Sequence, residues 1–178
     1  MFDSTVIKFC IDGDRKSQEK LYNHYASRMK GVCMRYAKSK QAAEDIFQDG
    51  FVKVFMNLYK YNGQGSFDGW VRRIIVNTAI DAYKKNLRLN DTSSYDDLKE
   101  QELITIDSFE YLKERELLEL LQKLPDVLRL VFNLYAIEGY THKEIAEMLQ
   151  ITENASKSQL YRSRKLIQQM LFNYNSKV

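Results

Sequence analysis

Two carboxylates one helical turn apart are the first residues in this sequence whose spacing suggests chemistry. Asp45 and Asp49 are four residues apart, so both lie on one face if their segment is helical. Carboxylates alone suit Mg²⁺ when a substrate phosphate completes the shell. No second acidic cluster accompanies them in the predicted helices of the first half. A metal site therefore ranks below a solvated acidic face and below a docking surface for a basic partner.

Aromatic and basic residues beside a glycine-containing loop form a second candidate. Trp70, the only tryptophan, follows the loop 62–66 and is followed by Arg72, Arg73, Lys84 and Lys85. Aromatic rings stack on unpaired bases while basic side chains hold phosphates, so the arrangement is typical of single-strand nucleic-acid binding. Packing of the tryptophan in a core is the alternative, and residue types alone favour it.

The second half contains the pattern of a helix-turn-helix. Thr141 and Glu144 have the spacing of a capping box at the start of a helix. Ala146 is small enough for a second helix to pack closely, and Thr152 is placed to cap that helix. Gln150 stands where many such turns have glycine, which predicts a residue in a left-handed or strained turn.

The last predicted helix, from residue 153 onward, carries five basic residues and one acidic residue. Such a helix fits the major groove of DNA, where lysine and arginine meet guanine acceptors or phosphates. A basic surface helix without a partner is the alternative, and the cap and turn pattern favours DNA binding. The side chains predicted to be exposed for this purpose are Lys157, Ser158, Tyr161, Arg162, Arg164 and Lys165.

An enzyme is disfavoured. The chain has only two histidines, His24 and His142, and it lacks a nucleophile-elbow motif, a phosphate-binding loop and a cluster of metal ligands. His142 falls in the first turn of a predicted helix, where it is expected to contact solvent or a phosphate. We therefore predict no catalytic residue, no cofactor and no metal.

The elements that position these residues are predicted to be helices. One proline and seven glycines among 178 residues provide little of the turn chemistry that a sandwich or barrel needs. Apolar residues recur at spacings of three and four, as in Phe47, Phe51, Val54 and Leu58. In the first half the predicted helices cover residues 3–9, 15–37, 41–61 and 67–86. Arg73, Asn77 and Asp81 follow one polar stripe of the fourth.

Charge divides the chain into three parts. Residues 1–86 hold 15 basic and 9 acidic side chains, residues 87–110 hold 2 and 7, and residues 111–178 hold 10 and 8. The acidic middle lacks helical periodicity, and long loops are uncommon within compact domains. The predicted fold is therefore all-α, with two small helical domains, 1–86 and 111–178, joined by an acidic flexible linker, 87–110. The second is a helix-turn-helix domain.

The location of the protein is predicted to be cytoplasmic. Cys10 and Cys33 form neither a CxxC pair nor a disulfide framework, which is typical of a reduced compartment. The first residues lack the pattern of a signal peptide, and no apolar run reaches the length of a membrane span. Neither cysteine has a nearby basic cluster that would lower its pKa, so a redox role is left open.

Three segments, in this order, resemble bacterial RNA polymerase sigma factors of the extracytoplasmic-function (ECF) subfamily. Residues 43–55 (AEDIFQDGFVKVF) resemble the polymerase-binding helix, and residues 67–81 (FDGWVRRIIVNTAID) the promoter-melting and minus-ten helix. Residues 124–125, 139–146 (GYTHKEIA) and 157–164 (KSQLYRSR) resemble the minus-thirty-five domain. The chain departs from the family pattern at Asp49-Gly50, where a glutamate and a bulky residue are frequent, and at Ser156, where valine is frequent.

The resemblance implies a factor that binds core polymerase and reads two promoter elements. The implied partners are the clamp and flap of core RNA polymerase, promoter DNA and an anti-sigma factor. The loop near residues 61–67 would capture a flipped minus-ten base, and Trp70 would support the melted junction. The implied core-binding residues are Asp45, Gln48, Asp49 and Phe51. The implied minus-ten residues are Asn62, Ser66, Phe67, Trp70, Arg73, Asn77 and Asp81.

Two other functions compete with this interpretation. A regulator that binds duplex DNA alone shares the second half, but it does not need the acidic surface or the aromatic, loop and basic arrangement of the first. The second alternative is a purely structural helical protein, which does not explain why the last helix is basic. A requirement for core polymerase in specific binding discriminates the first of these from a sigma factor.

Overall fold

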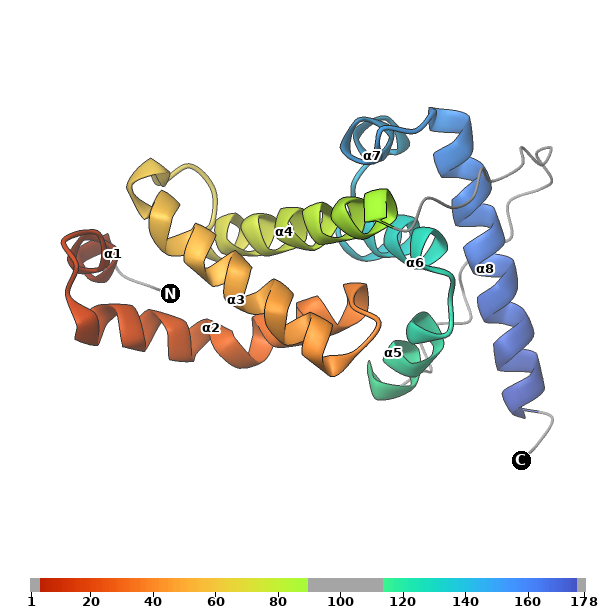
Figure 1. Ribbon diagram of the computed structural model, residues 1–178, viewed down its shortest axis with the longest axis horizontal. Coiled ribbons are helices and arrows are strands. Elements are labelled where there is room, and N and C mark those ends of the chain that lie inside the picture. The colour runs from red at the N-terminus through yellow and green to blue at the C-terminus, as the bar shows by residue number, and fades with distance from the viewer. Residues whose placement is uncertain (1–3, 90–113, 176–178) are drawn as a thin grey trace. The chain divides into compact units, whose positions relative to one another are not determined.

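The computed structural model describes residues 4–89 and 114–175, and every element in these two ranges is a helix (Figure 1). The prediction of an all-helical fold is confirmed. The chain divides into two compact units, Met1–Lys85 and Asn86–Val178. The elements are α1 (Ser4–Ile11), α2 (Arg15–Tyr36), α3 (Lys40–Asn57), η1 (Leu58–Lys60), α4 (Phe67–Leu89), α5 (Glu114–Gln122), α6 (Asp126–Phe132), η2 (Asn133–Ile137), α7 (His142–Leu149) and α8 (Glu153–Asn175).

The first unit is built on the three long helices α2, α3 and α4, and α1 packs on α2 and η1 (Figure 1). Side-chain oxygens begin these helices as local chemistry predicts: Asp14 accepts from the Ser17 N–H at 2.8 Å, and Ser39 accepts from the Ala42 N–H at 3.1 Å. The fully enclosed core side chains come from all three helices and include Leu21, Tyr25, Met29, Phe47, Val54, Val71 and Ile75.

Helices α3 and α4 approach closely at Gly50. A Cβ atom on this residue would lie 2.5 Å from Cδ1 of Ile75, which is closer than carbon atoms can pack. Glycine at this position therefore sets the spacing between the two helices. A larger side chain at this position would not fit without a shift of Ile75.

Helix α4 is longer than predicted. It continues to Leu89, so residues 87–89 are helical rather than part of the linker. The remainder of the predicted linker, residues 90–110, lies outside the described residues.

In the second unit, α8 packs on α5, α6 and α7. The helix-turn-helix follows the predicted local chemistry. The Thr141 hydroxyl accepts from the Glu144 N–H at 3.3 Å, and the Glu144 carboxylate accepts from the Thr141 N–H at 2.8 Å, which completes the capping box. Gln150 adopts a left-handed conformation (φ 59°, ψ 43°), and Thr152 accepts from the Ala155 N–H at 3.0 Å to begin α8. All three predictions are confirmed.

The end of α6 differs from expectation. The helix widens into a π-helical turn, η2, in which the Glu138 N–H donates to the Asn133 carbonyl at 2.9 Å. Gly139 then ends the element with φ 78°, the left-handed conformation in which glycine commonly terminates a helix. A π-helical turn leaves no periodicity signal in so short a segment, and it was not predicted.

No helix in the described ranges combines the length and apolar character needed to cross a membrane.

Candidate nucleic-acid and protein interfaces

The loop before α4 is closed on itself. The Tyr61 hydroxyl donates to the Gly65 carbonyl at 2.9 Å, and the Gln64 N–H donates to the Asn62 side chain at 3.1 Å. Gly63 and Gly65 have φ of 80° and 75°, a conformation that favours glycine. The predicted residues Asn62 and Ser66 are exposed in this loop, and the Ser66 hydroxyl caps α4 by accepting from the Gly69 N–H at 3.0 Å.

An aromatic cluster lies against the loop. The Phe67 and Trp70 rings stack with centroids 5.6 Å apart, and Tyr61 contacts the two rings at 5.0 and 5.7 Å. Trp70 is half-buried: it packs in the cluster, and part of the side chain remains exposed. Phe67 is only 7% exposed. The ring is covered by its neighbours and supports them, and its contact with DNA stays a prediction.

Helix α2 holds the first turn of α4. Asp68 Oδ1 accepts from the Tyr25 hydroxyl at 2.6 Å and from Arg28 Nη2 at 2.6 Å. The Tyr25 hydrogen bond, together with Arg28, holds the pKa of the Asp68 carboxyl below its usual value. Burial and the neighbouring Asp68 raise the pKa of Tyr25. Sequence reasoning missed this contact, because nothing local links residues that are 43 and 40 positions apart.

The polar stripe of α4 is exposed as predicted at Arg73, Asn77 and Asp81. Asp81 is also tied to α3: its Oδ2 lies 2.9 Å from Lys53 Nζ. Both side chains remain largely in solvent, so the bridge is worth little for stability. Its effect is to add a lysine from α3 to the surface that α4 presents.

The outer face of α3 is acidic in its first half. Asp45, Gln48 and Asp49 are exposed, as their spacing predicts. Phe51 is 2% exposed and packs edge-on against Tyr22 at 5.1 Å. Its contact with core polymerase stays a prediction. In the described ranges no group of three or more His, Cys, Asp or Glu side chains is arranged to hold a metal ion.

The same face becomes apolar in its second half. Val52, Met56 and Tyr59 are 55%, 68% and 66% exposed and continue from Asp49 at spacings of three and four. Sequence reasoning did not select these residues. The available signal was their placement, because apolar side chains stand where the helical period expects polar ones.

Helix α8 presents fewer fully exposed side chains than expected. Lys157 and Lys165 are exposed, whereas Ser158, Tyr161, Arg162 and Arg164 are half-buried. The Arg164 guanidinium lies over the Tyr135 ring, 5.7 Å from its centroid. The side of α8 that packs against the rest of the unit includes buried polar residues as well as apolar ones. The polar residues are Ser156, Gln159 and Ser163.

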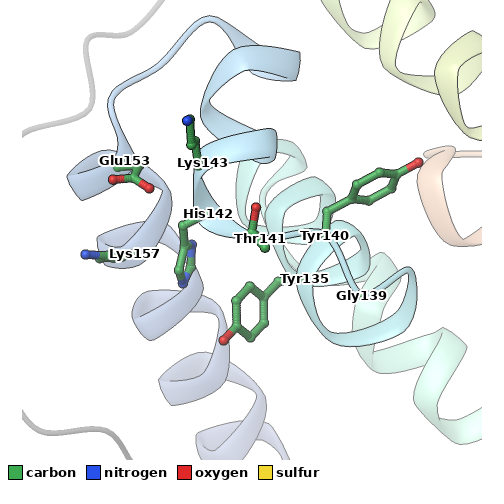
Figure 2. Close-up of a pocket in the computed structure, with 8 residues that line it drawn as sticks. All are labelled: Tyr135, Gly139, Tyr140, Thr141, His142, Lys143, Glu153 and Lys157. Carbon is green, nitrogen blue, oxygen red and sulfur yellow. The ribbon is translucent and has the colours of Figure 1, made fainter.

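A hollow of about 530 Å³ lies between η2, α7 and α8 (Figure 2). His142 forms its centre: the imidazole stacks on Tyr135 at 4.5 Å, and its Nδ1 lies 2.9 Å from the Ser156 hydroxyl. Burial, Lys157 and Arg164 lower the pKa of His142. The predicted contact of His142 with solvent is thus only partial. The hollow is lined by Tyr135, Gly139, Tyr140, Thr141, His142, Lys143, Glu153 and Lys157.

The cysteines do not form a disulfide, and both are buried. Burial raises the pKa of Cys10, and it raises the pKa of Cys33 to about 12. Both groups are therefore thiols near neutral pH, and the reactive thiolate form is suppressed.

Comparison with known families matches both units. Residues 21–89 match the family described as sigma-70 region 2, and residues 114–167 match the family described as sigma-70, region 4.

Individual relatives match nearly the whole chain. The ECF RNA polymerase sigma-E factor of Haemophilus influenzae is 24% identical over 93% of this chain and 93% of its own length. The RNA polymerase sigma-H factor of Pseudomonas aeruginosa is 25% identical over 95% of this chain and 93% of its own.

Two solved structures share the fold. One is CnrH in complex with the cytosolic domain of CnrY, with a TM-score of 0.50 and 19% identity over 95% of this chain and 96% of that one. The other is the sigma factor RpoE in complex with the anti-sigma factor NepR from Bartonella quintana, with a TM-score of 0.53 and 18% identity over 86% and 95%.

Proposed function

The chain belongs to the ECF-type RNA polymerase sigma factors and directs transcription initiation through sigma-70 regions 2 and 4, and from this premise we propose how its side chains divide that work. A sigma factor is an initiation factor rather than an enzyme, and it acts by binding core RNA polymerase. Residues 1–86 bind core polymerase and read the minus-ten element. Residues 111–178 read the minus-thirty-five element, and the acidic residues 87–110 connect the two.

Region 2 captures an unpaired base of the minus-ten element. The observation that carries this proposal is the closed loop 61–66 next to the half-buried Trp70, with Asn77 exposed about two turns further along α4. An amide offers both a donor and an acceptor to a base edge, and that edge is free only once the base leaves the stack. Part of the Trp70 ring is open to support the melted junction.

Charged residues on the same helix complete this surface. Arg73 holds a phosphate of the single strand. Lys53, paired with Asp81, adds a second cation, so Asp81 acts as one member of a pair rather than as a lone carboxylate. Asn62 and Ser66 contact the strand from the loop, where both are exposed.

Core polymerase binds the outer face of α3. Asp45, Gln48 and Asp49 suit a basic helical element such as the polymerase clamp, because charge complementarity steers and orients association. Val52 and Met56 extend this face with exposed apolar surface that a partner helix would cover. Phe51 supports the face from within the core.

Region 4 binds duplex DNA through α8. Lys157 and Lys165 are exposed and contact phosphates, while half-buried side chains in the same helix are held in place to meet base edges. The residues assigned to base edges are Ser158, Tyr161, Arg162 and Arg164. Lys143, at the rim of the hollow on α7, adds a phosphate contact. The polymerase flap is the proposed protein partner of this region.

An anti-sigma factor is proposed to regulate the protein, and the cytoplasm, where polymerase and promoter DNA meet, is its proposed location. Support comes from the second structural neighbour, which is described as a sigma factor bound to an anti-sigma factor. The exposed apolar residues of α3 are of the kind that such a partner covers.

Promoter-specific transcription with core polymerase tests the proposed function. Every base of the minus-ten element is substituted in turn, and the preference profile is measured with the wild-type protein and with Asn77→Ala. The variant should lose or change its preference at one position, while duplex minus-thirty-five binding stays the same.

A matched control is Asn86→Ala. Asn86 is exposed on α4 nine residues further on, so it lies on the opposite side of the helix. Its profile should equal that of the wild type. An unchanged profile for Asn77→Ala, or specific promoter binding without core polymerase, would contradict the proposal.

A further inference from the structure

One contact in region 2 joins two helices at the point where base capture is proposed. Asp68 lies in the first turn of α4, two residues after the capping Ser66 and two before Trp70. A single carboxylate oxygen, Oδ1, accepts both from the Tyr25 hydroxyl and from the Arg28 guanidinium of α2, each at 2.6 Å. We call Tyr25, Arg28 and Asp68 the α2–α4 brace.

Tyr25 anchors the brace on its α2 side, whereas the Arg28 side chain is 53% exposed. Tyr25 is 1% exposed, and its ring meets Phe67 edge-on at 6.0 Å. The Arg28 guanidinium lies over the Tyr25 ring, 5.3 Å from its centroid. The hydroxyl that points at Asp68 is thus held by packing from two directions, so it sets both the position and the rotation of the α4 first turn.

The brace also reaches the loop through the aromatic cluster. Phe67 touches Tyr25 on one side and stacks on Trp70 on the other. Tyr61 contacts both Phe67 and Trp70, and its hydroxyl closes the loop through the Gly65 carbonyl. A shift of the α4 first turn therefore displaces Trp70 and the loop together.

An acidic residue in a first helical turn has a simpler explanation, since it favours the positive end of the helix dipole. That explanation accounts for the charge of Asp68, but it needs neither Tyr25 nor Arg28. Two short hydrogen bonds from another helix to one oxygen are a specific arrangement, and charge-assisted bonds of this kind fix geometry as well as adding energy.

We propose that Asp68 is a positioning residue for minus-ten base capture: through Tyr25 and Arg28 it holds Trp70 and the 61–66 loop in the arrangement that accepts the flipped base. The inference rests on the proposed function of that loop. A binding-competent arrangement that becomes a fraction of the population lowers the apparent affinity by that fraction. If loss of the brace leaves about one molecule in ten competent, affinity for the single strand falls about tenfold.

The test uses the full-length protein bound to core polymerase and a single-stranded minus-ten oligonucleotide of the non-template strand. Asp68→Ala and Tyr25→Phe should each weaken binding of the preferred oligonucleotide by about five- to tenfold. The double variant should lose little more than Asp68→Ala alone, because that change already removes the hydrogen bond from Tyr25. Asp68→Asn, which keeps an acceptor for Tyr25, should retain more affinity than Asp68→Ala.

Asp12→Asn is the matched control. It removes an exposed aspartate from the same unit, and it should bind the oligonucleotide as the wild type does. Core affinity is measured for every variant and should stay near the wild-type value. Molecules in the displaced arrangement still hold the strand through the phosphate contact of Arg73, but they do not read the base. Discrimination between the preferred base and a mismatch should therefore also weaken, which a loss of charge alone would not cause.

Several outcomes overturn the proposal. Unchanged oligonucleotide affinity and discrimination in Asp68→Ala and Tyr25→Phe would do so directly. A fall in core affinity parallel to the fall in oligonucleotide affinity would assign Asp68 to folding instead. If the wild type itself shows no base preference, the proposed function of the loop fails and the positioning role fails with it. A wild-type preference that Asp68→Ala keeps in full removes the positioning role alone.

Discussion

Replacing Gly50 by alanine tests the packing that sets α4 against α3. Alanine normally stabilises a helix interior by about 1 kcal/mol relative to glycine. At Gly50 the added Cβ would meet Cδ1 of Ile75 at 2.5 Å, so this fully buried side chain would have to shift. Overpacking of this kind costs about 1–3 kcal/mol. The net effect expected for Gly50→Ala is a loss of up to about 2 kcal/mol in the free energy of unfolding.

Two further variants isolate the cause. Gly31→Ala makes the same substitution within α2, where nothing lies within 4 Å of the new Cβ, so it should gain about 1 kcal/mol. Ile75→Val removes the clashing atom and by itself costs about 0.5–1.5 kcal/mol. In the double variant the new methyl group fills part of the space left by Cδ1. The double variant should therefore be more stable than the sum of the two single changes by at least about 1 kcal/mol.

Denaturant unfolding followed by tryptophan fluorescence measures these values in the full chain. Trp70 is the only tryptophan and belongs to the first unit, so its signal reports that unit. Equal stabilisation by Gly50→Ala and Gly31→Ala would refute the close approach of the two helices. Additive losses in Gly50→Ala and Ile75→Val would refute the specific contact with Cδ1.

Two other predictions concern protonation and charge. The pKa of His142 is lowered in the folded chain, so the unfolded chain binds the proton more tightly and the stability of region 4 should fall as pH drops below about 6.5. Amide hydrogen exchange of α7 and α8 should become faster at acid pH in the wild type and in the control variant His24→Gln. The increase should be smaller in His142→Gln. An equal increase in all three proteins would contradict the role of His142. The double variant Asp45→Lys/Asp49→Lys should bind core polymerase at least about tenfold more weakly at low salt, with unchanged helical content. Undiminished affinity in a pull-down titration would contradict the assignment of this face.

Much of the local structure could be predicted because its causes are local. The capping box of Thr141 and Glu144, the left-handed Gln150 and the Thr152 cap each depend on residues within about four positions, and each has the expected geometry. The helical period likewise predicted which positions of α3 are exposed at Asp45 and Asp49. The π-helical turn η2 lies beyond this reasoning, since no short-range signal distinguishes it from the end of an ordinary helix.

Two aromatic rings that the family resemblance assigned to partners are buried in the structure. Phe51 and Phe67 were expected to contact partners because they stand in motifs that carry function, and both are buried. A motif states which residues occur together, whereas burial depends on what the other helices bring against them. Tyr22 covers Phe51, and Tyr25, Tyr61 and Trp70 surround Phe67.

The sequence by itself determined the all-helical class and the helix-turn-helix, because helical periodicity, caps and turns are properties of neighbouring residues. Only the tertiary structure decided how the surfaces are assembled. The contact of Tyr25 with Asp68 spans 43 residues, and that of Lys53 with Asp81 spans 28. His142 meets Ser156 for the same reason, at the crossing of α7 and α8. Such pairs depend on the angle and spacing at which helices pack, and these are set by side chains distributed over the whole core.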